Sequence, residues 1–207
     1  MALFKKSKGL VGLDIGSSAI KAVELKPVKG GGYQVVTLGI EPLAPEAIVD
    51  GTILDAAVVI DTISKLFRDS NIKTKDVATS VSGNAVIIKK ITLPLMTEDE
   101  LAESIQWEAE QYIPFDIEDV NIDYQILGQG AENMDVLLVA VKKDKINDYT
   151  SVISQANLNP VLVDVDAFAM QSAYEANYEL PSDEVVALVN IGASIMNINI
   201  LKSGSSV

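Results

Sequence analysis

The sequence predicts an α/β fold, with one large unit of strands and helices and a smaller unit inserted into it. Short apolar stretches of strand length and a stretch of helical periodicity make up the first part of the chain. The strand–turn–strand pattern of residues 13–26 recurs near the end of the chain, at residues 189–202. Between the two copies lies an acidic block, residues 91–141, whose elements follow a different order. Together these observations favour a main α/β unit that is interrupted once.

The first part of the chain is predicted to contain three strands, a helix and a further strand. Two apolar segments flank the turn at residues 16–18, and a third follows three consecutive glycines at residues 30–32. A helix is expected to start from Asp55, because the apolar residues after it follow the helical period. The predicted strands are residues 10–15, 19–26, 33–39 and 76–83.

The acidic block begins with a strand and a helix whose start is clearly marked. The strand "AVIIKKITLP" precedes "TEDELAESIQWEAEQYIP", in which Thr97 can cap the helix while Glu100 reaches back to it. Met96 and Leu101 can pack together around this cap, and Pro114 stops the helix. Two strands and a second helix are expected next, at residues 120–127, 135–142 and 145–156.

This β-α-β-β-α order is large enough to form a small α+β subdomain. We therefore expect an inserted acidic subdomain at residues 85–157 and a main unit formed by residues 1–84 and 158–207. The main unit resumes with the strand "PVLVDVDAF", a short helix at 167–177 and a final hairpin.

The composition excludes several kinds of chemistry. The chain has no cysteine and no histidine, which rules out disulfides, thiolate metal sites, Ser-His-Asp triads and histidine-ligated zinc. The formal net charge is −13, and residues 91–141 contain twelve acidic residues and no Lys or Arg. The negative electrostatic field of this acidic block repels nucleic acid, because contacts with phosphates need Lys and Arg. The acidic face either aids solubility or docks a basic partner.

The turn between the first two strands carries residue types that suit a phosphate. Gly16 gives the backbone conformational freedom and leaves room for a ligand, while backbone N–H groups and the Ser17 and Ser18 hydroxyls can surround an anion. Lys21 supplies positive charge, and Asp14 is suited to anchor hydrated Mg²⁺ beside phosphates. The alternative is an ordinary hairpin with small polar residues in its turn.

The recurrence of the pattern favours the phosphate interpretation. "LDIGSSAIKAVELK" aligns without gaps to "VNIGASIMNINILK", with five identities in fourteen positions and a fixed offset of 176 residues. The two hairpins bracket a strand that ends in Asp164 and Asp166. Neither the P-loop spacing nor the Rossmann glycine pattern is present.

The same residues carry a family resemblance. "LDIGSSAIK" resembles the first phosphate loop of the actin/Hsp70/hexokinase ATPase superfamily, and "VNIGAS" takes the place of the second. The inserted unit resembles subdomain 1C of FtsA-like proteins. The phrases "VSGNAVIIKKI", "ESIQWEAEQYIPFDIEDVNIDYQIL" and "DVDAFAMQSAYEANYE" resemble the PilM family of type IV pilus assembly proteins. The resemblance implies an actin-like (ribonuclease H-like) ATPase half whose main unit is subdomain 1A.

The resemblance also implies a site for ATP and Mg²⁺. Asp14 would hold Mg²⁺ through water, and Asp166 would be the catalytic residue that orients the attacking water. The other implied nucleotide-binding residues surround the phosphates from two sides: Gly16, Ser17, Ser18, Lys21, Asn190, Gly192, Ala193 and Ser194.

Two departures from the family pattern point to slow or absent hydrolysis. Relatives that hydrolyse ATP well usually carry Asp where this chain has Asn190, which lacks the charge that anchors water on Mg²⁺. The chain ends at Val207, whereas full-length relatives continue into a second half (2A and 2B) that supplies the adenosine-binding motif. We therefore expect a nucleotide-binding scaffold. The alternative is an active ATPase or a small-molecule kinase of the same superfamily.

The resemblance further implies a partner, the cytoplasmic N-terminal peptide of a PilN-like inner-membrane protein, docked between the ATPase core and subdomain 1C. Trp107, Tyr112 and Phe115 are candidate contacts, because aromatic residues dominate such interfaces; core packing is the alternative for each. The protein would lie in the cytoplasm, peripheral to the inner membrane through its partners. Other pilus platform and motor components, and self-association, are further expectations.

Overall fold

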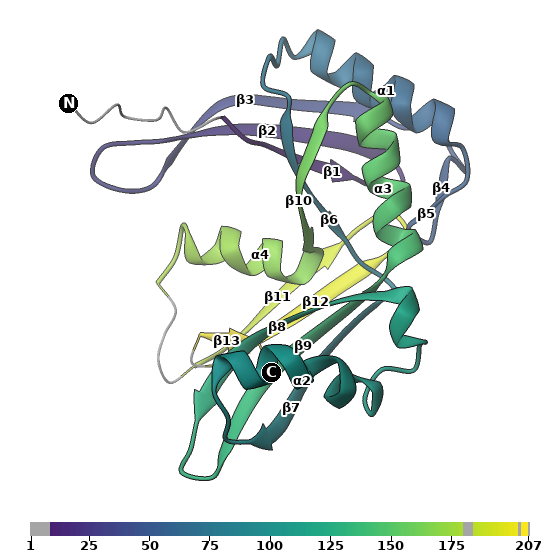
Figure 1. Ribbon diagram of the computed structural model, residues 1–207. Coiled ribbons are helices and arrows are strands. Elements are labelled where there is room, and N and C mark those ends of the chain that lie inside the picture. The colour runs from purple at the N-terminus through teal and green to yellow at the C-terminus, as the bar shows by residue number, and fades with distance from the viewer. Residues whose placement is uncertain (1–8, 180–183, 203, 207) are drawn as a thin grey trace, which may run out of the picture.

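The computed structural model describes residues 9–179, 184–202 and 204–206, and a five-stranded sheet forms the centre of the main unit (Figure 1). The strands lie in the order β10-β6-β1-β2-β3. The first three strands of the chain pair antiparallel, and β6 and β10 then continue the sheet in parallel from β1. Their bounds are β1 (Val11–Ile15), β2 (Ala19–Pro27), β3 (Tyr33–Pro42), β6 (Asp76–Val81) and β10 (Asn159–Val165). The strands predicted for these segments are confirmed.

Helix α1 (Ala56–Asp69) packs on one face of this sheet. The Asp55 carboxylate accepts a hydrogen bond from the backbone N–H of Val58 at 3.0 Å, so the expected helix start is confirmed. Two short strands that the sequence did not predict, β4 (Ile48–Val49) and β5 (Thr52–Ile53), form a hairpin just before the helix.

The acidic block forms a second sheet of three antiparallel strands, in the order β7-β9-β8, with helix α2 against one face. The bounds are β7 (Val86–Pro94), α2 (Glu98–Glu110), a 3₁₀ turn η1 (Ile117–Asp119), β8 (Val120–Gln129) and β9 (Asn133–Lys142). Both arms of the predicted capping box are present: Thr97 accepts from the N–H of Glu100, and Glu100 accepts from the N–H of Thr97. This unit has its own core, which includes Leu101 and Met134.

Helix α3 (Lys143–Gln155) packs differently from the expectation. The sequence placed it in the inserted subdomain, but its buried residues Tyr149, Val152 and Ile153 belong to the core beneath the five-stranded sheet. The physical reason is that α3 lies beside α1 and reaches β10, so its apolar stripe faces the main unit. A boundary near residue 142 therefore describes the packing better than one at 157. None of the helices in the described part of the chain has the length and apolar character needed to cross a membrane.

The last hairpin forms a sheet of its own. Its strands β11 (Val185–Ile191), β12 (Met196–Lys202) and β13 (Ser205–Ser206) pair with each other, and within the described residues none of them pairs with the five-stranded sheet. Helix α4 (Asp166–Glu175) connects the two sheets, and Asn199 of β12 donates to the Ala167 carbonyl at 3.0 Å. Of the residues expected in the main unit after position 157, β10 pairs into the five-stranded sheet, whereas the hairpin contacts the rest of the chain through α4.

Replacing Thr97 with Ala is expected to lower the free energy of unfolding by about 1 kcal/mol, because the N–H of Glu100 loses its side-chain acceptor. Urea denaturation measures this change. Ser151→Ala is the control, since Ser151 is exposed on α3 and its hydroxyl makes no hydrogen bond within the described residues. Equal urea midpoints for the two variants would show that the cap contributes nothing.

Candidate functional site

The two repeated hairpins turn in the same way. In the first, Gly16 N–H donates to the Ala19 carbonyl at 3.2 Å; in the second, Gly192 N–H donates to the Ile195 carbonyl at 2.9 Å. The strand registers that flank the turns also correspond, with Ile15 opposite Ile20 in one and Ile191 opposite Met196 in the other. The offset of 176 residues seen in the sequence therefore holds in the pairing of both hairpins.

Both glycines are needed for a close approach and not for an unusual backbone angle. Neither has a positive φ, which corrects the expectation that Gly16 serves conformational freedom. A Cβ atom at Gly16 would lie 3.0 Å from the Ala19 carbonyl oxygen, and one at Gly192 would lie 2.7 Å from the Ile195 carbonyl oxygen. The turn thus leaves no room for a side chain at Gly192, and at Gly16 a side chain would push the Ala19 carbonyl aside by a few tenths of an ångström.

The two turns face each other across a pocket of about 150 Å³. The hydroxyls of Ser17 and Ser194 are hydrogen-bonded at 2.5 Å, which joins the turns directly. Ser194 itself borders the neighbouring space and not this pocket. The other residues predicted for nucleotide, Mg²⁺ and catalysis all line the pocket: Asp14, Gly16, Ser17, Ser18, Lys21, Asp166, Asn190, Gly192 and Ala193.

The charged groups in this pocket are already held by neighbours. Lys21 Nζ lies 2.8 Å from Asp14 Oδ2, across the β1–β2 pair. Asp166 begins α4 and accepts from Ser80 Oγ at 2.6 Å and from Asn197 Nδ2 at 3.2 Å. Asp166 therefore links the end of β6 to β12 in the sheet of the last hairpin.

The donor set fits a hydrated magnesium ion better than a fully protein-bound metal. Asp14 and Asp166 line the same pocket, and among the described residues no group of three or more acidic side chains converges as a metal site. Mg²⁺ is usually held by one or two carboxylates together with waters and phosphates. Asp14 is thus suited to anchor Mg²⁺ through water.

Two residues of α3 that carry no recognisable motif lie at the edge of the same pocket, one lining it and the other bonded to Gly51 in its wall. Tyr149 lines it, and both the Tyr149 hydroxyl (at 3.0 Å) and Lys145 Nζ donate to the Gly51 carbonyl. Burial lowers the pKa of Lys145, although the negative charges of Asp148 and Asp166 oppose this change. Burial, with added effects from Asp166, Asp14 and Asp148, raises the pKa of Tyr149 to about 12. No motif marked these residues, because α3 was assigned to the inserted subdomain.

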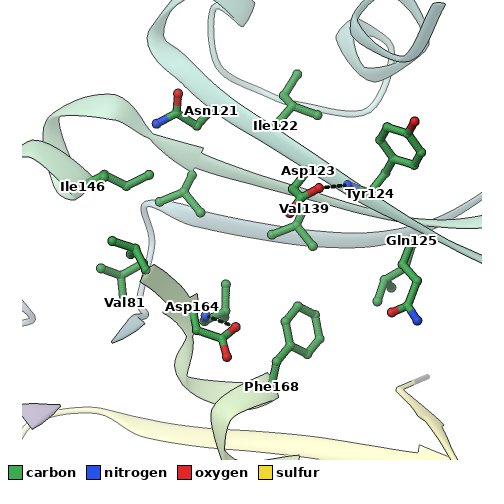
Figure 2. Close-up of a pocket in the computed structure, with 14 residues that line it drawn as sticks. Val81, Asn121, Ile122, Asp123, Tyr124, Gln125, Val139, Ile146, Asp164 and Phe168 are labelled. Atoms are coloured by element: carbon green, nitrogen blue, oxygen red, sulfur yellow. Dashed lines mark hydrogen bonds between the residues drawn. The ribbon is translucent and has the colours of Figure 1, made fainter. Parts of the chain in front are cut away.

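A larger cavity, of about 410 Å³, lies between the inserted sheet and the main unit (Figure 2). Strands β8 and β9 form one wall, and the ends of β6 and β10 with Phe168 of α4 form the other. Val81 lines both this cavity and the pocket between the turns.

The three predicted aromatic contacts do not line this cavity. Trp107 is 73% exposed on α2. Tyr112 and Phe115 are partly buried against the core of the inserted unit. Lys89 Nζ lies 5.3 Å from the centre of the Tyr112 ring, and Lys142 Nζ lies 4.2 Å from the centre of the Phe115 ring. Tyr112 and Phe115 therefore pack in the core, which was the alternative to a partner contact for each of the three aromatic residues.

Comparison with known proteins identifies the family. The family model described as type IV pilus assembly protein PilM matches residues 12–207. The chain belongs to the PilM family. A solved PilM-PilN type IV pilus biogenesis complex superposes with a TM-score of 0.84 at 30% identity, covering 96% of this chain. This chain spans 59% of the length of the matched chain in that complex.

Two more distant structures share the fold. The cytoplasmic domain of EpsL, an inner-membrane component of the type II secretion system of Vibrio cholerae, matches with a TM-score of 0.60 at 16% identity; the match covers 95% of this chain and 68% of that domain's chain. The ethanolamine utilization protein EutJ from Carboxydothermus hydrogenoformans matches with a TM-score of 0.50 at 15% identity. This match covers 98% of the present chain and 50% of the EutJ chain. The expected α/β fold of the actin-like type is confirmed.

Gly192→Ala is expected to lower the free energy of unfolding by about 1–3 kcal/mol, because the new Cβ forces the Ile195 carbonyl out of the turn. Gly128→Ala is the matched control, since a Cβ there meets no atom within 4 Å. Denaturant unfolding of both variants measures the difference. If Gly192→Ala were as stable as the control, the close approach would not constrain the turn.

The raised pKa of Tyr149 makes stability fall at high pH. Because the folded protein favours the neutral phenol, the unfolded chain ionises first, at the ordinary tyrosine pKa of 10.0. The free energy of unfolding should therefore fall as pH rises from 10.0 toward about 12. Tyr149→Phe should show a shallower fall over this range in urea unfolding. Equal slopes for the two proteins would contradict the buried phenol.

Proposed function

We propose that this protein is a nucleotide-binding scaffold of type IV pilus assembly that docks a PilN-like membrane protein. The observation that supports it most directly is the pair of facing glycine turns beside a cavity at the inserted subdomain, in a chain of the PilM family. The solved relative is a PilM-PilN complex, which makes a PilN-like protein the natural candidate partner.

The ligand proposed for the pocket between the turns is Mg-ATP, which would supply an anionic phosphate chain and its cation. The N–H groups and hydroxyls of the two turns would bind the phosphates, and the Ser17–Ser194 hydrogen bond would be exchanged for bonds to them. Lys21 would neutralise part of the phosphate charge, and Asp14 would hold water on the cation.

Slow or absent hydrolysis follows from the same residues. Asp166 can orient a water, but its two oxygens already accept bonds from Ser80 and Asn197. Asn190 provides no negative charge on the opposite side of the pocket. The loss of one electrostatic group commonly reduces a rate by about 10². Binding can therefore persist while turnover is low.

The proposed docking site is the cavity of about 410 Å³ and not the three aromatic residues. Its walls are largely apolar, with Val139, Val163 and Phe168 among them. Strand β8 borders it, and within the described residues β8 pairs only with β9. An extended peptide could thus bury apolar side chains in the cavity and bond to the open strand edge. Docking there would hold the protein at the cytoplasmic face of the inner membrane, where contacts with other pilus components and self-association could follow.

Calorimetric titration of this chain with the N-terminal cytoplasmic peptide of the PilN-like protein tests the proposal, with and without Mg-ATP. We expect saturable binding that Val139→Trp abolishes, because the indole would fill the cavity. Val36→Trp on exposed β3 is the control and should bind normally. Absence of binding by the folded protein would refute the docking function.

Phosphate release measured in parallel separates the scaffold from its alternatives. The scaffold predicts little or no release. Rapid release would indicate an active ATPase, and release that depends on a second small substrate would indicate a kinase.

A further inference from the structure

The large cavity combines apolar walls with two negative charges. Asp123 and Asp164 are the charged residues among those that line it, and no Lys or Arg lines it. They come from opposite walls: Asp123 from β8 of the inserted sheet and Asp164 from β10 of the main sheet (Figure 2). Apolar side chains flank both carboxylates, with Val139 near Asp123 and Phe168 near Asp164.

Among the described residues, each carboxylate accepts one hydrogen bond, from the backbone N–H of the next residue. Asp123 Oδ1 accepts the N–H of Tyr124 at 2.9 Å, and Asp164 Oδ1 accepts the N–H of Val165 at 2.7 Å. Within the described residues, the second oxygen of each carboxylate has no hydrogen bond and neither carboxylate forms an ion pair. This contrasts with Asp14, which is paired with Lys21.

The charge on Asp164 is costly to the protein alone. Burial raises the pKa of Asp164, the Val165 N–H opposes this change, and the nearby negative charge of Asp166 adds to the rise. An Asn at this position could still accept the Val165 N–H without carrying a charge. The carboxylate therefore offers no evident advantage to folding, and Asp164 lines a cavity large enough for a ligand.

A cationic side chain is the group that these features fit. A Lys or Arg has an aliphatic stem that can pack on Val139 and Phe168 while its head pairs with a carboxylate. Cytoplasmic segments next to membrane spans are enriched in Lys and Arg, so the peptide of a membrane partner commonly carries such residues. The apolar stem of such a side chain matches the apolar walls of the cavity, and its positive head matches the two carboxylates.

We propose that Asp123 and Asp164 determine the specificity of the docking cavity by pairing with a Lys or Arg of the bound peptide. This inference rests on the docking function proposed above. In this arrangement the apolar side chains of the peptide are buried in the cavity. The cation determines which segment of the partner binds and in which register.

Peptide titration with charge-neutral variants tests the pairing. Asp164→Asn and Asp123→Asn should each weaken binding of the PilN-like N-terminal peptide by about tenfold, with a steep dependence on salt in the wild type. The matched control is Asp61→Asn, an exposed acid on α1 outside the cavity. A set of peptides with each Lys or Arg changed in turn to Gln should contain one that binds wild type about tenfold more weakly. That peptide should lose little further affinity on Asp164→Asn or Asp123→Asn.

Unfolding measurements separate this role from a structural one. Asp164→Asn should unfold at a urea concentration equal to or above that of wild type, because the costly charge is removed while the bond to Val165 remains available. A drop in stability together with weaker binding would overturn the inference, as would unchanged affinity of both Asn variants. If the wild-type protein binds none of the peptides, the docking function itself fails, and this inference falls with it.

Discussion

The parallel pairing of β1, β6 and β10 determines where the functional groups of this molecule lie. Because the three strands run in the same direction, their carboxyl ends meet at one edge of the sheet. Asp14 near the end of β1, Ser80 near the end of β6 and Asp166 directly after β10 are gathered there. Ligands of open α/β sheets generally bind at this edge. The second glycine turn completes the pocket from the separate sheet of β11 and β12.

The same strand ends also place the two cavities side by side. Val81 lines both, and only Val165 separates Asp164 of the larger cavity from Asp166 of the turn pocket. A ligand that displaced the end of β10 would therefore move groups in both cavities. Such a shared wall gives a direct physical route for one ligand to alter the affinity of the other, provided that each prefers a different position of the strand.

Local signals in the sequence predicted local structure, and packing between distant segments decided the rest. The capping box at Thr97, the paired turns and the strands flanking them depend on residues a few positions apart, and all are present. The position of α3 depends on which of two cores accepts its apolar stripe, and the sequence of the helix does not encode that choice. The resemblance placed the partner between the main unit and the inserted unit, but the residues that line the cavity there depend on packing: they come from β6, β8, β9 and β10, and Trp107, Tyr112 and Phe115 are not among them.

The partners of the acidic residues distinguish two kinds of site. In the turn pocket, Asp14 and Asp166 are held by Lys21, Ser80 and Asn197, so their positions are fixed before any ligand arrives. Preorganised groups of this kind bind a ligand without first being ordered. In the cavity proposed for docking, Asp123 and Asp164 each keep one oxygen without a hydrogen bond to any described residue. A carboxylate between apolar walls gains most from a cation that arrives with its own apolar stem, because water is displaced as the pair forms. The fixed groups of the turn pocket suit a small, polyanionic ligand with its metal. The carboxylates of the larger cavity suit a peptide that is recognised by its sequence.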